Sequence, residues 1–189
     1  MAVLGKGHNT TYLYKHTEND TKYAVREIVA QRNNEYSDAI QKLEDLEEIK
    51  KMNHPNILVY HGICFEKGRV HSKYKNIRTI YIFTEIAVKS FEEHLDQSQK
   101  DKEYLTLKNA KRLITSLLSS LASLHQKLGL PHGDIKPSNI LIMEDGSYKI
   151  SDLGEVKNIL KRIEYKHAVE SSLNYLAPEL FEMFGKRSF

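Results

Sequence analysis

The first third of the chain contains short apolar runs, rich in β-branched and aromatic residues, that predict strands. Two such runs lie at residues 11–14 and 22–29, and the polar turn at 17–21 between them predicts a β-hairpin. Two later runs, at 57–61 and 79–84, predict two more strands. This part of the chain is therefore expected to form a small antiparallel sheet.

Apolar residues at three- and four-residue steps predict two helices. The first covers about 36–52 and is expected to stop before Pro55, because a residue that precedes proline avoids the α region. The second has an apolar stripe with the helical period. The stripe consists of Leu107, Ala110, Leu113, Ile114, Leu117, Leu118, Leu121 and Leu124.

The last predicted elements are a second hairpin and a linker. Residues 140–143 and 148–150 have strand character, and the turn residues 144–147 lie between them. A linker between two parts of the chain is expected at about 85–90, where a strand gives way to short polar and helical sequence.

Composition excludes several classes of protein. The 189 residues suffice for one domain or two small lobes, and 40% hydrophobic with 28% charged residues is typical of a soluble globular protein. A net charge of +3 does not indicate nucleic acid, and the basic stretch 66–78 is interpreted as a solvated surface loop. The sequence contains no signal peptide and no apolar span, so we expect no membrane partner. Cys64 is the single cysteine, which favours a reducing compartment, the cytoplasm or nucleus.

The strongest chemical signal is an ordered set of polar residues around the second hairpin. Asp134 and Asn139 stand before its first strand, and Asp152 stands after its second. Phosphoryl transfer needs a carboxylate that accepts or orients a hydroxyl, and an amide oxygen and a carboxylate that hold Mg²⁺. Lys136 could offset charge on the transferred group. Taken singly, these residues could instead be turn residues or a helix cap. Their order around a hairpin favours the catalytic interpretation.

With these residues in place, the chain resembles a eukaryotic protein kinase domain of the Ser/Thr type over nearly its whole length. The motifs occur in the family's order. They are Gly5-x-Gly7, Tyr23-Ala24-Val25-Arg26, His54-Pro-Asn-Ile, His132-Gly133-Asp134, Asp152-Leu153-Gly154 and Ala177-Pro178-Glu179. Lys136 and the segment from Ser171 to Tyr175 resemble the Ser/Thr branch.

The resemblance implies a two-lobed fold of the α+β class, with an N-lobe at 1–87 (antiparallel sheet plus one helix) and an incomplete, mainly helical C-lobe at 88–189. It implies transfer of the ATP γ-phosphoryl group to a protein hydroxyl, with Mg²⁺. Asp134 and Lys136 would be catalytic, Asn139 and Asp152 would bind the metal, and Ser172 would position substrate. The residues implied in nucleotide binding are Leu4, Gly5, Gly7, Ala24, Arg26, Thr84, Glu85, Ala87 and Leu141.

Several positions depart from the family pattern in the part that holds the nucleotide. Arg26 replaces the lysine of V-A-I-K, and the two cations are not equivalent. Asp45 stands where the helix glutamate is expected, although Glu44 and Glu48 are alternative partners. If the glycine-rich segment has normal length, Tyr12 covers adenine; if it is one residue short, Thr11 does.

Other departures concern the second half of the chain. Gly133 replaces the arginine of H-R-D, so an arginine clamp on a phosphorylated segment is not expected. The sequence ends at Phe189, where the family continues with further helices. We therefore expect the apolar stripe from Leu107 to be less well covered, and a protein partner could cover it. An impaired pseudokinase that acts as a binding module, and a non-functional fragment, are the alternative interpretations.

Overall fold

The structure is a computed structural model that describes residues 2–6, 10–30, 47–67, 78–129, 131–153, 174–175 and 177–178. The chain divides into two compact units. Unit 1 comprises Met1–Asn53 and Leu58–Val88, and unit 2 comprises His54–Ile57 and Lys89–Phe189. The short segment His54–Ile57 thus belongs to unit 2 although both of its neighbours in the chain belong to unit 1. The division expected from the sequence, 1–87 and 88–189, has one boundary and does not assign this segment to the second part.

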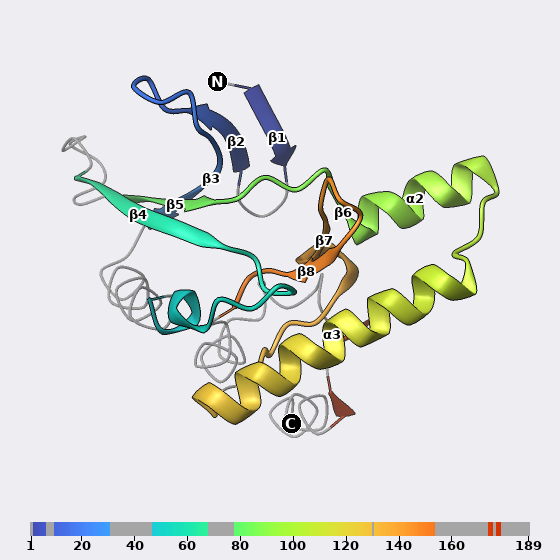
Figure 1. Cartoon of the computed structure of the whole chain (residues 1–189). Helices are drawn as coiled ribbons and strands as arrows, with labels where there is room; N and C mark the ends of the chain where they lie inside the picture. The colour runs from blue at the N-terminus through green and yellow to red at the C-terminus, as the bar shows by residue number, and fades with distance from the viewer. Residues whose placement is uncertain are drawn as a thin grey trace, which may run out of the picture. The chain divides into compact units, whose positions relative to one another are not determined.

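Unit 1 is built on a five-stranded sheet with the order β1-β2-β3-β5-β4 (Figure 1). Its strands are β1 (Ala2–Lys6), β2 (Thr10–Lys15), β3 (Lys22–Ala30), β4 (Tyr60–Lys67) and β5 (Arg78–Thr84). All neighbouring strands are antiparallel. The β2–β3 pairing confirms the predicted first hairpin, in which Lys15 pairs with Lys22.

Most of the buried residues of this sheet lie in its central strands. Val25 on β3 and Ile80 and Ile82 on β5 are buried. The pairing partners Val25 and Phe83 share one face, on which Phe83 makes edge-to-face contacts with Tyr14 and Tyr23. Such contacts add to the stability gained from apolar burial. This packing stabilises the strands that also carry the residues on the other face.

One predicted strand of unit 1 needs correction, and one predicted helix lies partly outside the described residues. The strand expected at 57–61 begins only at Tyr60 and continues to Lys67. Ile57 is not part of it, because Ile57 forms an isolated parallel bridge with Ile150 in unit 2. The structure describes the helix expected at 36–52 only over residues 47–52, where it is helical.

Unit 2 combines two helices with a small sheet. The helices are α2 (Phe91–Asp101) and α3 (Leu107–Leu128), and the sheet has the order β6 (Lys89–Ser90), β7 (Ile140–Ile142), β8 (Tyr148–Ile150). A 3₁₀ turn, η1 (Pro137–Asn139), precedes β7. The β7–β8 pairing confirms the predicted second hairpin.

Local sequence explains where both helices begin and end. Ser90 and Glu93 form a capping box at the start of α2, in which each side chain accepts a hydrogen bond from the backbone of the other residue. Thr106 caps the start of α3, and Gly129 ends it with a φ of 63°. Sequence analysis did not predict α2 as a separate helix.

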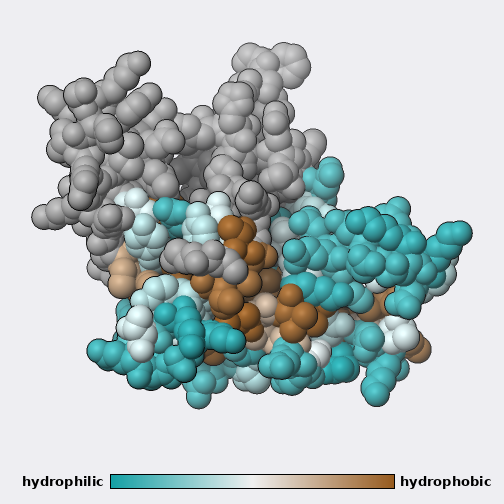
Figure 2. Space-filling view, turned by 90° about the horizontal axis from the view of Figure 1, so that it is seen from above, coloured by the Kyte–Doolittle hydropathy of each residue, from teal (hydrophilic) through white to brown (hydrophobic). Residues whose placement is uncertain are grey.

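The core of unit 2 lies where the helices meet the small sheet. Phe91, Leu113, Ile140 and Tyr148 form one buried cluster, and the rings of Phe91 and Tyr148 are 6.1 Å apart at 83°. In Figure 1, α3 lies along the hairpin, and α3 contacts β8. Hydrophilic side chains cover α2 in the space-filling view (Figure 2). This packing holds the loop between α3 and β7 in place.

Only part of the predicted apolar stripe on α3 is buried. Leu113 and Leu124 are buried, whereas Leu107, Ile114 and Leu118 are 72%, 56% and 63% exposed. This agrees with the expectation that the stripe is incompletely covered. Within the described residues, no helix is long and apolar enough to cross a membrane.

Candidate active site

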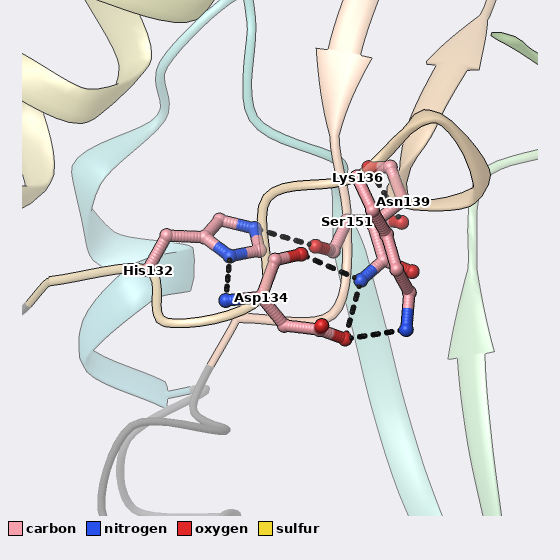
Figure 3. Close-up of polar contacts among 5 residues, drawn as sticks. All are labelled: His132, Asp134, Lys136, Asn139 and Ser151. Carbon is pink, nitrogen blue, oxygen red and sulfur yellow. Dashed lines mark hydrogen bonds and ion pairs between the residues drawn. The ribbon is translucent and has the colours of Figure 1, made fainter. Parts of the chain in front are cut away.

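Three of the polar residues predicted to carry chemistry, Asp134, Lys136 and Asn139, lie together between α3 and β7 (Figure 3). The Asp134 carboxylate accepts a hydrogen bond from Asn139 and forms an ion pair with Lys136, and both contacts are 2.8 Å long and made at Oδ2. The side chains of Asp134 and Lys136 are only 9% and 17% exposed. Because water screens such a pair weakly, each charge acts strongly on its neighbour.

Asn139 is fixed by the same carboxylate and by the backbone next to it. Its Nδ2 donates to Asp134 Oδ2 and to the Asp134 main-chain oxygen, both at 2.8 Å. An amide group has two N–H donors on nitrogen and only acceptors on oxygen. Both contacts therefore require nitrogen in this place, and Oδ1 is the atom that can face a cation.

His132 supports the loop from behind Asp134. Its Nδ1 accepts a hydrogen bond from the Asp134 backbone N–H at 3.2 Å, and its Nε2 lies 2.9 Å from the Ser151 carbonyl oxygen. An acceptor at Nδ1 and a donor at Nε2 define the neutral tautomer with its proton on Nε2. Gly133, between them, has a φ of 83°, a conformation that glycine adopts without strain.

Asp152 follows β8 at the other side of this loop. Its φ is 59°, in the left-handed region that costs energy for a residue with a Cβ atom. The preceding Ser151 and the following Leu153, which is 1% exposed, hold the turn in place. Backbone strain of this kind is frequent at functional sites, where surrounding contacts maintain it.

Asn139 and Asp152 offer side-chain oxygen donors, the type that suits a hard cation such as Mg²⁺. The described residues contain no group of three or more His, Cys, Asp or Glu side chains that could hold a metal. Mg²⁺ commonly uses one or two carboxylates and takes its remaining ligands from phosphates and water. The residues present therefore fit a cation that arrives with a phosphate ligand.

Unit 1 carries the residues predicted to contact a nucleotide. Ala24 and Arg26 lie on β3 and pair with Thr84 and Ile82 on β5. Directly paired residues, and residues two apart on one strand, share a face of a sheet. Ala24, Arg26 and Thr84 are therefore on one face. Three other predicted nucleotide-binding residues are described: Leu4 and Gly5 lie on β1 in unit 1, and Leu141 lies on β7 in unit 2.

The pairing of β2 with β3 resolves which β2 residue shares that face. Thr11 pairs with Arg26, and Tyr12 pairs with Val25. Thr11 thus lies on the face of Ala24 and Arg26, and Tyr12 lies on the opposite face. Pairing between β1 and β2 shifts register between Val3 and Gly5. Of the two alternatives left open by the sequence, the register favours Thr11.

The segment after β5 is held by hydrogen bonds to its neighbours in unit 1. Val59 N–H donates to Glu85 Oε1 at 2.8 Å, and Glu85 N–H donates to the Val59 carbonyl at 3.1 Å. The Thr84 hydroxyl lies 3.1 Å from the Glu85 carbonyl oxygen and 3.4 Å from that of Ala24. The Glu85 side chain thus helps to hold this segment in place. Ala87, further along the segment, is half-buried.

Some predicted site residues lie outside the described residues, namely Gly7, Asp45 and Ser172. In contrast, the structure adds two residues to which sequence analysis gave no role. His132 and Ser151 connect the main chains of Asp134 and Asn139. The position of His132, two residues before Asp134, could have indicated a role in the site. No sequence pattern marks Ser151, because its contacts depend on how the residue after β8 meets η1.

Known proteins provide an independent comparison. A family model described as protein kinase domain matches residues 1–188. CBL-interacting protein kinase 21 of Oryza sativa subsp. japonica is 25% identical over 94% of this chain and 32% of its own length. Serine/threonine-protein kinase Aurora-2 of Arabidopsis thaliana is 29% identical over 95% of this chain and 58% of its own length. The glycogen synthase kinase-3 homolog YGK3 of Saccharomyces cerevisiae is 31% identical over 84% and 40%, respectively.

The chain thus spans about a third of the length of the first relatives that it matches. The family match covers nearly the whole chain, and it includes both the strands of unit 1 and the Asp134 loop of unit 2. The motif order, the α+β architecture and this match agree, and the chain belongs to the protein kinase domain family.

Proposed function

We propose that the chain transfers the γ-phosphoryl group of ATP to a serine or threonine hydroxyl of a protein. The observation that carries the proposal is the buried contact set of Asp134 with Lys136 and Asn139. Phosphoryl transfer requires mainly positioning and charge neutralisation, and this set combines a carboxylate, an ammonium group and a metal-binding amide. One of the named relatives, Aurora-2, is a serine/threonine-protein kinase, which supports serine and threonine as the hydroxyl groups that accept the phosphate.

In this proposal Asp134 orients the attacking hydroxyl and accepts its proton as the hydroxyl oxygen bonds to the γ-phosphorus; the bond from that phosphorus to ADP breaks, and ADP leaves. Lys136, held 2.8 Å from Asp134 Oδ2, would neutralise charge on the transferred group. The Asn139 contact to the same oxygen keeps the carboxylate from rotating. The ion pair and the hydrogen bond thus hold these side chains in position before substrate binds.

Asn139 and Asp152 would hold Mg²⁺ through oxygen atoms. A bound Mg²⁺ ion would supply charge neutralisation on the phosphates. This chain contributes the placement of the two ligands, because Asn139 turns its nitrogen toward Asp134 and Asp152 directly follows the bonded Ser151. In unit 1, Thr11, Ala24, Arg26 and Thr84 share the face proposed to meet the nucleotide.

One experiment tests the assigned role of Asp134. Asp134→Asn keeps the size of the side chain and removes its ability to accept a proton, so phosphate transfer should fall about 10²–10⁴-fold. The matched control is Asp145→Asn in the turn between β7 and β8, where the carboxylate accepts the Ser147 N–H. Transfer of labelled phosphate to a generic protein substrate is the measurement. Activity of Asp134→Asn equal to that of Asp145→Asn would contradict the assignment.

A second function is favoured by one specific residue, Arg26. Its forked guanidinium stands on β3 where the family has a compact lysine ammonium, and the two bind phosphates differently. The alternative is a catalytically impaired kinase domain that acts as a binding module. Arg26→Lys should raise phosphate transfer if this position limits catalysis. Strong transfer by the unmodified chain, with no gain in Arg26→Lys, would reject the alternative.

A further inference from the structure

Ser151 occupies an unusual position between the two residues proposed to hold Mg²⁺. It is covalently joined to Asp152, and it is hydrogen bonded to Asn139. Figure 3 shows Ser151 beside Asn139, opposite His132 and Asp134. No chemical role was assigned to it from the sequence or in the proposed mechanism.

The contacts of Ser151 converge on one acceptor. Its backbone N–H donates to the Asn139 carbonyl oxygen at 2.9 Å, and its hydroxyl donates to the same oxygen at 3.1 Å. A carbonyl oxygen has two lone pairs, so these donors can occupy both of them. The Asn139 peptide is therefore held from two directions by a single residue.

The carbonyl group of Ser151 completes a closed circuit of hydrogen bonds. It accepts the His132 Nε2 proton at 2.9 Å, while His132 Nδ1 accepts the Asp134 N–H. Asn139 Nδ2 then donates to Asp134, which closes the circuit. Asn139 is 6% exposed and His132 is 2% exposed, so water competes little for these bonds.

We infer that Ser151 is a positioning residue whose hydroxyl sets the separation of the Asn139 and Asp152 ligands. The inference rests on the proposed function. Ser151 fixes Asn139 by hydrogen bonds, and its own peptide determines where the strained Asp152 begins. Groups that orient the ligands of a metal commonly change its affinity when they are removed. Loss of the hydroxyl should loosen one ligand relative to the other.

The expected effect follows from the strength of one hydrogen bond. Ser151→Ala removes only the hydroxyl contact, because the backbone N–H and carbonyl bonds remain. A typical net value of 0.5–1.5 kcal/mol corresponds to about a 2- to 10-fold weaker cation affinity. Ser151→Thr restores a hydroxyl and should bind as the unmodified chain does. Ser147→Ala, which removes a serine hydroxyl from the same hairpin, should have no effect.

Cation binding can be measured without catalysis. Mn²⁺ prefers the same oxygen ligands as Mg²⁺, and its electron paramagnetic resonance signal distinguishes free from bound ions. We would titrate Mn²⁺ into the full 189-residue chain at a fixed, saturating concentration of ADP. The unmodified chain should bind Mn²⁺ more tightly than ADP alone does, and Ser151→Ala should need about 2- to 10-fold more Mn²⁺ for half-saturation.

The outcomes separate this inference from the proposed function. If the unmodified chain binds Mn²⁺ and Ser151→Ala binds it equally well, the positioning role is wrong and the metal site stands. If the unmodified chain shows no binding beyond that of ADP, both are wrong. Should Ser151→Ala fail to fold, the pair Ser151→Thr and Ser151→Val gives the same test. Thr and Val have similar shapes, so equal affinities in that pair would also overturn the inference.

Discussion

Asn139 and Asp134 are joined by two hydrogen bonds that start from a single nitrogen atom, Asn139 Nδ2, and end at Asp134 Oδ2 and at the Asp134 main-chain oxygen, both at 2.8 Å. Both acceptors belong to one residue, so the amide cannot rotate by half a turn without placing an oxygen against two oxygens. The contact links the residue proposed to act on the hydroxyl with a residue proposed to bind the metal.

This relationship predicts a strong effect of a small substitution. Asn139→Asp changes one atom group, but an ionised carboxylate has no donor and would face the Asp134 carboxylate in a buried place. We expect it to lower the free energy of unfolding by about 2–4 kcal/mol, because two hydrogen bonds become repulsive contacts. Thermal or urea unfolding measures the change.

The control for that prediction is Asn139→Ala, which removes the donors without adding charge. Asn139→Ala should be destabilised less than Asn139→Asp. If Asn139→Asp unfolded at the same temperature as the unmodified chain, the two hydrogen bonds would not have the geometry described.

The register of β2 against β3 predicts which residue affects nucleotide binding. Thr11 shares a sheet face with Ala24 and Arg26, whereas Tyr12 pairs with Val25 on the other face. Thr11→Phe should therefore weaken ATP binding about 5- to 150-fold, since overpacking commonly costs about 1–3 kcal/mol. Tyr12→Phe should leave the ATP affinity unchanged. Fluorescence titration with a labelled ATP analogue measures both, and the reverse order of effects would show that the register is wrong.

His54 predicts how stability depends on pH. Burial and the nearby Lys127 ammonium lower the pKa of His54 below its usual value of 6.5. His54 Nδ1 accepts the Asn56 N–H at 3.1 Å, and Nε2 lies 3.1 Å from the Ser119 hydroxyl on α3. Both contacts fit the neutral ring, and a proton on Nδ1 would break the first.

Because the pKa is lower in the folded chain, the unfolded chain takes up the proton first as the pH falls. The folded state should lose stability from about pH 7 downward through 6.5, and the loss should stop below the folded pKa. His54→Gln should show a smaller loss of melting temperature between pH 7.5 and pH 5. A matched substitution on α2, His94→Gln, should keep the full loss. Identical pH profiles for the unmodified chain and His54→Gln would exclude this role.

Local patterns predicted the elements whose partners lie nearby in the sequence. Both hairpins followed from runs of strand-forming residues on either side of turn residues, and both were confirmed. The helix α2 was missed, although Ser90 and Glu93 have the spacing of a capping box and could have revealed it. Its low apolar content gave no helical stripe.

Long-range contacts explain where sequence-based prediction failed. The expected strand at 57–61 starts later, because Ile57 pairs with Ile150, which lies about half the length of the chain away. Asn56 makes a similar distant contact, since its Nδ2 donates to the Tyr148 carbonyl at 2.9 Å. Sequence patterns predicted the types of residue in the site. They could not show that Ser151 and His132 hold those residues together, because one partner in each of these contacts is a backbone atom, which every residue has.

The most direct test of the central claim, that this kinase domain binds ATP with Mg²⁺ through Asn139 and Asp152, is the melting temperature of the chain with ATP alone and with ATP and Mg²⁺. Saturation at about a hundred times the dissociation constant stabilises the native state by about 2.7 kcal/mol, which is about 5–10 °C for a chain of this size. We predict that rise only when Mg²⁺ is present, and a much smaller rise for Asp152→Ala. An unchanged melting temperature, or an equal rise in Asp152→Ala, would contradict the account.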